Sequence, residues 1–290
     1  MPGARSIAAA LVLGLVLLAT AACGDGSGAP SPGRFDGERA FREAAAQVAM
    51  GPRPAGSAAS RRLAARIRAK LPHGRFEAVP GGLRNVVGTL PGRGKAILVG
   101  AHYDTKDIPG FVGANDGAGG TATVLELARV LRADRRACER PIRFVFFDGE
   151  ETPDDLADFY STGLRGSRAY ARRHAKALAA AVIVDFVGDK DLSLPREAGS
   201  DRALWARLRA AAKRAGTLSA FPNRTVGEIL DDHTPFARAG VPSIDLIDFD
   251  YPPWHTTGDT LDKISAASLD RAGEALVLFL RDLSRAPCGR

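Results

Sequence analysis

Five short stretches of the chain carry side chains that could bind a metal ion and move protons. They contain histidine, aspartate and glutamate but no cysteine, a set typical of catalytic zinc sites with three protein ligands and one open position. The sequence has no GxSxG, HExxH or CxxC pattern, which argues against the common serine hydrolases, helix-based zinc proteases and thiol redox enzymes. The five stretches are AHYDT (101–105), GANDGAGG (113–120), DGEE (148–151), VDF (184–186) and WHTT (254–257).

The adjacent carboxylates Glu150 and Glu151 could divide two tasks between them. Neighbouring side chains at the end of a strand point to different sides, so one could bind metal while the other transfers protons. Burial raises the pKa of such a carboxylate and a nearby cation lowers it, and the balance decides whether it is a base near neutral pH. His102 and Asp104 are two positions apart and face the same way on a strand. Asp104 could therefore accept a hydrogen bond from the far ring nitrogen of His102 and fix its tautomer.

An alternation of strands and helices must position these side chains. This alternation predicts an α/β fold with a mostly parallel sheet that is covered on both faces. Because ligands bind outside the carboxyl ends of the strands in such sheets, we expect the five stretches to meet at one rim. The predicted strands span 75–79, 85–89, 95–102, 142–147, 181–186 and 241–247, and the predicted helices span 35–50, 57–71, 117–133, 165–178, 201–216 and 268–283.

The first residues have the pattern of an export signal. A positive charge at Arg5 precedes an apolar run from Ile7 to Cys23, which is shorter than the roughly 20 residues of a membrane span. Cys23 resembles the lipidated cysteine of a bacterial lipoprotein box, and an ordinary signal peptide is the alternative. We expect a signal peptide at 1–22, a lipidated cysteine with a flexible tether at 23–34, and one catalytic domain at 35–290. The protein is then exported and either anchored to the bacterial cell envelope or secreted.

Charge and cysteine content limit the partners. The formal net charge is +7, but the arginines are scattered and form no basic block with interleaved aromatic residues, so we expect no nucleic-acid partner. Contact with a membrane is expected only through a lipid anchor at Cys23. The remaining cysteines, Cys138 and Cys288, could pair in an exported protein. The pairing and the oligomeric state are left open.

The five stretches, in this order and spacing, resemble the exported zinc aminopeptidase and glutaminyl cyclase family. The matching segments are AHYDT, GANDGAGG, FFDGEE, VDF and WHTTGDT, and GPRPAGS at 51–57 is similar to the entry segment of that family. The resemblance implies a single-domain three-layer α/β sandwich of the zinc-exopeptidase type, with a mostly parallel mixed central sheet. It also implies a zinc enzyme that acts at the N-terminus of a peptide or protein.

One branch of this family consists of aminopeptidases with two zinc ions. By resemblance, Asp116 would bridge the two ions and Glu150 would deprotonate the attacking water. Two neighbouring ions suit hydrolysis, because together they stabilise the attacking and the departing atoms. Glu151 and His255 would complete one ion, and His102 and Asp185 would complete the other.

The second branch consists of glutaminyl cyclases with one zinc ion, which the resemblance places on Asp116, Glu151 and His255. The ion polarises the side-chain amide of an N-terminal glutamine, the α-amine attacks, and ammonia leaves. Glu150 would carry the proton from the amine to the leaving group. Asp185 would hydrogen-bond to Glu150 instead of binding a second ion.

Other segments favour the cyclase branch. DDHTPF at 231–236 is similar to the cyclase segment whose first aspartate joins the proton network, which makes Asp231 a catalytic candidate; its alternative interpretation is a helix start. Trp254 resembles the aromatic wall of the cyclase pocket and would contact substrate. Two departures are Leu230, which replaces a polar residue, and the absence of tryptophan in the segment after Glu151. We therefore favour a glutaminyl-peptide cyclotransferase-like enzyme over an aminopeptidase, with a metal-free binding module as the third possibility.

Overall fold

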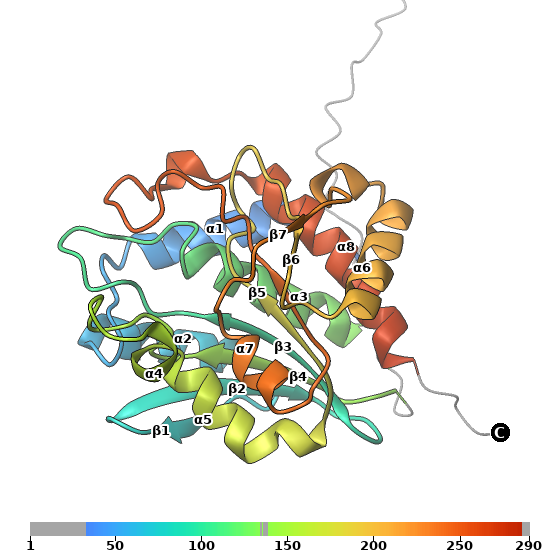
Figure 1. The fold of residues 1–290 in the computed structure, drawn as a ribbon, viewed down its shortest axis with the longest axis horizontal. Helices are drawn as coiled ribbons and strands as arrows, with labels where there is room; N and C mark the ends of the chain where they lie inside the picture. Colours follow the sequence, from blue (N-terminus) through green and yellow to red (C-terminus); the bar gives the residue numbers. More distant parts are fainter. Residues whose placement is uncertain (1–32, 134, 136–138, 286–290) are drawn as a thin grey trace, which may run out of the picture.

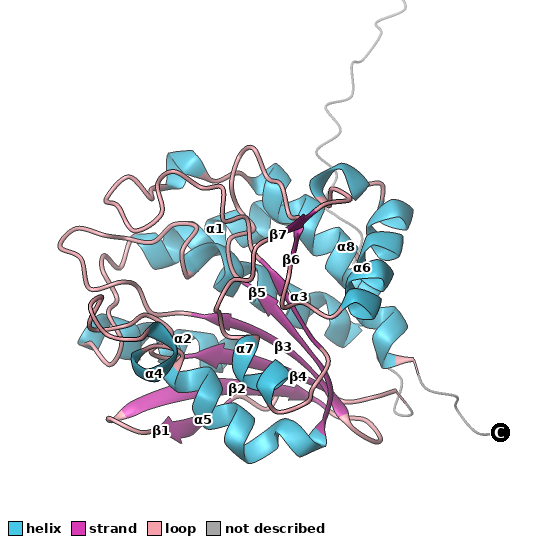
Figure 2. Ribbon diagram, in the orientation of Figure 1, coloured by secondary structure: helices cyan, strands magenta, loops and turns pink. Residues whose placement is uncertain are grey.

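The chain is built around one mixed sheet of six strands. The computed structural model describes residues 33–133, 135 and 139–285. The strand order is β1-β2-β4-β3-β5-β8, and Figure 2 shows the strands side by side between helices. The strands are β1 (Arg75–Val79), β2 (Leu83–Leu90), β3 (Ala96–His102), β4 (Ile142–Phe147), β5 (Leu178–Val184) and β8 (Ser243–Leu246).

Four neighbouring strands of this sheet run in the same direction. β4, β3, β5 and β8 pair in parallel, whereas β1 and β2 form an antiparallel extension at the β4 side. The carboxyl ends of the four parallel strands therefore lie at one edge. His102 ends β3 opposite Phe147, which ends β4, so the segments that follow these strands start side by side.

Helices cover both faces of the sheet, which gives three layers (Figure 1). Apolar side chains of α1, α2, α3, α6 and α8 form one core with one face of the strands. Side chains of α5 and α7 pack on the opposite face. The longer helices are α1 (Gly37–Val48), α2 (Ala58–Lys70), α3 (Ala118–Ala133), α5 (Arg165–His174), α6 (Arg202–Ala215) and α8 (Ala266–Ser284); the short ones are α4 (Phe159–Thr162) and α7 (Thr234–Arg238).

The central strand β3 illustrates why this sequence forms a buried sheet. All of its residues are buried, and its side chains alternate between the two faces. Ile97 and Val99 belong to the larger core, while Leu98 packs with the α5 and α7 side chains. A continuous apolar run of this kind is expected where helices cover both faces of a parallel sheet.

Local signals in the sequence set the ends of several helices. Ser57 precedes α2, and its side chain accepts a hydrogen bond from the Ser60 N–H. Asp201 caps α6 in the same way, and Gly216 ends α6 with a φ of 77°. Such caps satisfy backbone groups that a helix end leaves unpaired.

The predicted three-layer α/β sandwich with a mostly parallel mixed sheet is confirmed. Two element boundaries differ by three residues or more: the helix expected at 165–178 ends at His174, a 3-10 turn follows, and β5 begins at Leu178 instead of Ala181. α4 and the two-stranded sheet of β6 (Arg196–Glu197) and β7 (Thr225–Val226) were not predicted, and α7 appeared only as the alternative interpretation of DDHTPF. These elements have five residues or fewer and lack a periodic pattern.

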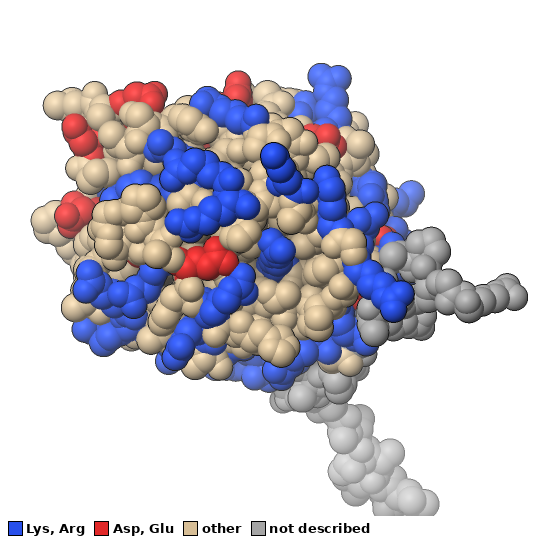
Figure 3. Space-filling model, turned by 90° about the horizontal axis from the view of Figure 1, so that it is seen from below, with Lys and Arg blue, Asp and Glu red and all other residues tan. Residues whose placement is uncertain are grey.

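Several sequence predictions fall outside the described residues. These are the signal peptide at 1–22, the lipidated Cys23 and the pair formed by Cys138 and Cys288. Within the part of the chain that the structure describes, none of the helices is long and apolar enough to cross a membrane. Figure 3 shows Lys and Arg side chains spread over the face seen from below, with few acidic side chains between them.

Candidate active site

Two groups of possible metal ligands share one carboxylate, that of Asp116. Its Oδ1 lies 3.3 Å from His102 Nε2, and its Oδ2 lies 3.6 Å from His255 Nε2. The first group is completed by Asp185, whose Oδ1 lies 3.2 Å from His102 Nε2. The second is completed by Glu151, whose Oε2 lies 3.3 Å from His255 Nε2. In each group the ligand atoms lie within 4.8 Å of one another.

The loop that carries Asp116 from β3 into α3 has a backbone that requires glycine. Gly113 and Gly117 have φ values of +52° and +89°, and an added Cβ would lie 2.2 Å from Asp116 O and 2.7 Å from Asp104 O, respectively. Asp259 holds the loop from outside, because its two oxygens accept hydrogen bonds from the N–H groups of Asn115 (2.9 Å) and Asp116 (3.0 Å). The Asp116 carboxylate is therefore positioned by its own backbone.

His102 is held at the end of β3. The Thr121 hydroxyl of α3 donates a 2.6 Å hydrogen bond to His102 O. Asp104 lies beside the ring, with 3.8 Å between its Oδ1 and His102 Nδ1, which is longer than a hydrogen bond. The Asp104 carboxylate instead accepts hydrogen bonds from the N–H groups of Glu150 (3.2 Å) and Glu151 (3.4 Å). Asp104 thus links the β3 end to the glutamate pair.

His255 has an unusual backbone and an aromatic neighbour. Its φ is 51°, a left-handed conformation that is uncommon for a residue with a side chain and often marks a functional site. The Trp254 ring stacks on the imidazole, with 4.3 Å between the ring centroids and an interplanar angle of 25°. The Phe111 ring is almost perpendicular to the imidazole, with 6.2 Å between the ring centroids and an interplanar angle of 85°. These rings limit the orientations that His255 can adopt.

Burial and crowding of carboxylates dominate the electrostatics. Burial, and next the charge of Glu151, raise the pKa of Glu150 well above its usual range. Burial raises the pKa of Glu151 to about 7 and that of Asp185 to about 8. Burial alone would lower the pKa of His102, but the surrounding carboxylates raise it well above its usual value. Buried carboxylates in this arrangement favour a cation or bound protons.

The donor set fits zinc. Asp116, Glu151 and His255 supply two carboxylates and one imidazole, a combination used in catalytic zinc sites. Asp116 Oδ2 and Glu151 Oε1 are buried without a hydrogen-bond partner, so both are available as ligands. His102, Asp116 and Asp185 form a second group that could hold another ion.

A pocket of about 440 Å³ opens beside this cluster. The buried carboxylates Glu150, Asp185 and Asp231 line it. Its lining also contains three partly exposed apolar side chains, Leu230 (37%), Phe249 (44%) and Trp254 (41%). Most of the site residues predicted from the sequence line this pocket, whereas His102 and Asp104 are not among its lining residues.

The segment between Glu151 and α5 forms one wall of the pocket. It contributes Thr152, Asp155, Ala157 and Phe159. Lys106 holds its start, because the buried ammonium donates to Thr152 O (3.1 Å) and pairs with Asp155. The same ammonium lies 3.9 Å from Glu151 Oε2. Phe159 supplies an aromatic side chain from the segment in which the sequence has no tryptophan.

A helix does begin within DDHTPF, but the expectation that Asp231 or Asp232 is its N-cap is wrong. α7 begins at Thr234, and the residue before it, His233, makes no side-chain cap hydrogen bond. Asp231 contacts Thr234 through its own N–H and C=O groups. The Asp231 side chain therefore does not cap α7, and it lines the pocket.

Two residues that hold the loops of the site, Arg53 and Asp259, were not predicted from the sequence. Arg53, within the GPRPAGS segment, is fully buried and donates to Gln47 O, Gly51 O and Gly113 O. Asp259, within WHTTGDT, holds the Asp116 loop, and Tyr251 donates a 2.6 Å hydrogen bond to its Oδ1. Arg53 and Asp259 both lie inside segments that resemble the family, and this position in a motif was the one sign in the sequence that pointed to them.

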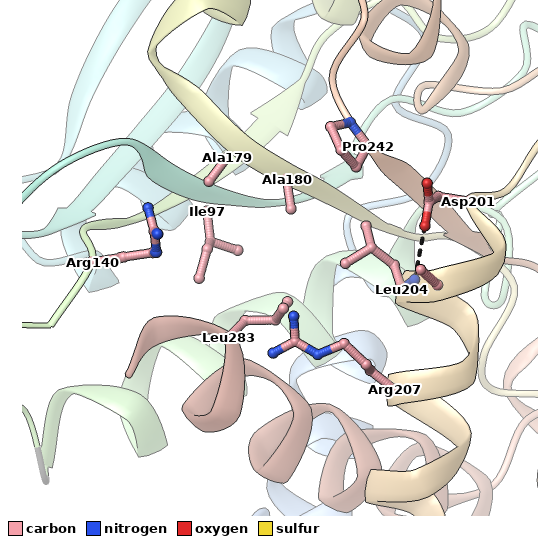
Figure 4. Close-up of a pocket in the computed structure, with 10 residues that line it drawn as sticks. Ile97, Arg140, Ala179, Ala180, Asp201, Leu204, Arg207, Pro242 and Leu283 are labelled. Carbon is pink, nitrogen blue, oxygen red and sulfur yellow. Dashed lines mark hydrogen bonds between the residues drawn. The ribbon is translucent and has the colours of Figure 1, made fainter. Parts of the chain in front are cut away.

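A second pocket, of about 340 Å³, lies at the opposite edge of the sheet. It is formed by Ile97 and Ala180 at the amino ends of β3 and β5, with Arg140 and Arg207 at its sides (Figure 4). Its carboxylate, Asp201, already caps α6 through Leu204 N. This pocket contains no histidine and no carboxylate pair, so the metal and acid/base chemistry belongs to the other edge.

The fold and the site together define an α/β protein of the zinc-exopeptidase type. The model of peptidase family M28 matches residues 85–280, and the chain belongs to this family.

Its relatives include cyclases and exopeptidases. A glutaminyl-peptide cyclotransferase-like protein of Mus musculus is 29% identical over 231 residues, which cover 68% of this chain and 60% of the mouse protein. A glutaminyl cyclase structure from an Acidobacteriales bacterium is 33% identical with a TM-score of 0.76, covering 88% of this chain and 97% of that one. A Zn-dependent exopeptidase structure from Parabacteroides distasonis is 25% identical with a TM-score of 0.75, covering 85% and 98%. Family and relatives imply zinc.

Proposed function

We propose that this protein is a glutaminyl-peptide cyclotransferase-like zinc enzyme, which converts an N-terminal glutamine to pyroglutamate and releases ammonia. The observation that carries the proposal is the grouping of Glu150, Asp185 and Asp231 around the pocket that adjoins Asp116, Glu151 and His255. Cyclisation moves a proton from the α-amine to the leaving nitrogen and consumes no water. A set of neighbouring carboxylates suits such a transfer.

In the proposed reaction the pocket residues bind, orient and transfer protons. Zinc on Asp116, Glu151 and His255 would act as a Lewis acid that polarises the glutamine side-chain amide. Trp254 and Phe249 confine the glutamine side chain. Glu150 accepts a proton from the α-amine as the amine nitrogen bonds to the amide carbon. It then donates this proton to the amide nitrogen, whose bond to carbon breaks, and ammonia leaves.

A di-zinc aminopeptidase is the second candidate, and a specific geometry favours it. Asp116 directs one oxygen to His102 and the other to His255, as a bridging carboxylate would. In that case Asp185 and His102 would hold the second ion, and Glu150 would deprotonate the attacking water.

Product analysis separates the two candidates. The purified protein is incubated with zinc and either a Gln-initiated or a Leu-initiated peptide of otherwise equal sequence. Ammonia and a pyroglutamyl peptide, 17 Da lighter by mass spectrometry (about one NH₃), support the cyclase. Free leucine supports the aminopeptidase and overturns the cyclase proposal. Absence of both products would favour a binding module.

We further propose that the protein is exported and anchored through a lipid on Cys23. The support is the sequence of residues 1–23 alone. The test is metabolic labelling with a radioactive fatty acid in a bacterial host, followed by fractionation. Wild type should carry label and sediment with membranes, and Cys23→Ala should do neither. An unlabelled wild-type protein in the soluble exported fraction would leave an ordinary signal peptide as the explanation.

A further inference from the structure

A third group of possible metal ligands adjoins the pocket and shares Asp231 with it. It consists of Asp231, His233 and Asp245, whose donor atoms all lie within 4.8 Å of one another. The three residues are 3%, 2% and 0% exposed. They come from two segments: the first two precede α7, and Asp245 lies on β8. We propose that these three side chains form a buried binding site for a divalent zinc-type cation.

The group contains unpaired polar atoms in the protein interior. Both oxygens of Asp245, Asp231 Oδ2 and His233 Nδ1 are buried without a hydrogen-bond partner. Leaving such atoms unsatisfied costs free energy, and native structures rarely do so at several neighbouring positions. A cation would satisfy all of them together.

The imidazole of His233 lies between two carboxylates. Its Nε2 lies 3.4 Å from Glu197 Oε1, which has no hydrogen-bond partner among the described residues, and its Nδ1 lies 3.7 Å from Asp245 Oδ2. Glu197 itself is anchored, because its Oε2 accepts hydrogen bonds from Gly199 N (2.7 Å) and Ile229 N (3.4 Å). A carboxylate on the far side of a metal-binding imidazole is a common arrangement, and Nδ1 is the ring nitrogen that faces Asp245.

The charges of the group also suit a divalent cation. Asp231 and Asp245 carry two negative charges when both are ionised, and Glu197 adds a third carboxylate beside His233. Buried carboxylates without a compensating positive charge are costly, and a divalent cation would neutralise two of these charges. Burial, and next the charges of Asp231 and Asp185, raise the pKa of Asp245 well above its usual range. A shared proton between Asp231 and Asp245 is therefore the competing explanation, and the experiment must separate it from a bound ion.

The site has an entry path and a consequence for the pocket. Asp231 lines the active-site pocket, so an ion can enter from there. An ion held by Asp231 and His233 would also fix the backbone before α7, including the pocket residues Ile229 and Leu230. Total zinc content is then one ion higher than the pocket alone would give, and a simple count cannot separate a cyclase from an aminopeptidase.

The test uses the full chain and zinc as the only added ligand. In the Asp116→Ala/His255→Ala background, elemental analysis should still find about one zinc ion per chain. Adding Asp245→Asn should remove it. Adding Asp232→Asn should not, and this variant is a matched control because Asp232 is equally buried with unpaired oxygens. The proposal is overturned if the Asp116→Ala/His255→Ala protein binds no zinc, or if its zinc remains after Asp245→Asn is added. Either result favours the proton shared between Asp231 and Asp245.

A second measurement covers variants that fail to fold. Wild-type crystals grown with zinc are measured on both sides of the zinc absorption edge. An anomalous peak between Asp231, His233 and Asp245 is the expected result. A peak confined to the cluster around Asp116 refutes the buried site while leaving the proposed enzymatic function intact. A peak at the buried site together with no ammonia release supports the buried site and counts against the cyclase function.

Discussion

At the scale of single residues, Asp116 is the side chain on which the site depends. Its two oxygens face two different histidines, at 3.3 Å and 3.6 Å. This explains why both branches of chemistry were compatible with the same motifs: the bridging position exists whether one ion or two are bound. The distinction must come from the residues that move protons.

Glu150 is the first of these residues. We predict that Glu150→Gln lowers turnover by ~10²–10⁴, the usual effect of losing a general acid/base, because an amide cannot accept the proton. The fold and bound zinc should be unchanged, since Glu150 is not in either ligand group. Steady-state kinetics with circular dichroism and metal analysis check this. Glu228→Gln is the control, an exposed carboxylate of the same pocket; near-normal turnover of Glu150→Gln would refute the role.

His255 and Asp116 are predicted to be metal ligands. His255→Ala or Asp116→Ala should each lower bound zinc by about one ion per chain, because three-ligand sites rarely retain zinc when one ligand is removed. Elemental analysis after dialysis measures this. His174→Ala is the control, since His174 pairs with Glu77 away from the site. Zinc content equal to that of wild type would exclude the altered residue as a ligand.

The sequence predicted these ligands because each follows a strand or enters a helix, where the fold class places chemistry. It did not predict the contacts of Asp259 or Arg53. Asp259 binds the Asp116 N–H across 143 positions of the chain, and Arg53 binds Gly113 O across 60. Both contacts are made to backbone atoms, whose position no residue pattern reveals.

At the scale of elements, the site is a set of strand-end loops braced against one another. The loop into α3 needs glycine at 113 and 117, but its position also depends on Asp259, which comes from the segment before α8. The short helix α4 was not predicted, and α7 was only the alternative interpretation of DDHTPF. α4 borders the pocket through Phe159, and Asp231 lines it from the segment before α7. Elements this short are defined by tertiary contacts and not by propensity.

Asp259 gives an element-scale prediction. Asp259→Ala removes the acceptor for two N–H groups of the Asp116 loop and for the Tyr251 hydroxyl. We expect zinc affinity of the pocket site to fall by roughly 10–100-fold, as for other residues that orient ligands, with the fold retained. Chelator competition followed by activity measures this. Asp262→Ala, an exposed carboxylate three positions along, should behave as wild type. If Asp259→Ala binds zinc as tightly as wild type, the Asp116 loop keeps its conformation without the Asp259 hydrogen bonds.

At the scale of the whole molecule, many carboxylates are buried near the pocket. On the face seen in Figure 3, basic side chains outnumber acidic ones. Buried carboxylates with raised pKa values make the folded state bind protons more tightly than the unfolded state. Stability from each such group is therefore greatest in acid and decreases as the pH rises.

Asp248 allows this effect to be tested away from the metal ligands. Burial raises its pKa from 3.8 to about 6, and its Oδ2 accepts a 2.6 Å hydrogen bond from Ser193 N. Its favourable contribution is complete below pH 3.8, decreases as the pH rises, and is lost above about 6. Asparagine keeps the acceptor without the charge. Asp248→Asn should therefore become more stable relative to wild type between these pH values.

The expected gain is on the order of 1 kcal/mol, after allowance for screening by solvent. Urea unfolding of both proteins from pH 4 to pH 8 measures it, and the difference between them should rise up to about pH 6 and then stay constant. Loss of zinc in acid affects both proteins equally and cancels in the difference. A difference that does not depend on pH would mean that the Asp248 carboxylate is charged throughout, with Ser193 N–H and solvent compensating for its burial.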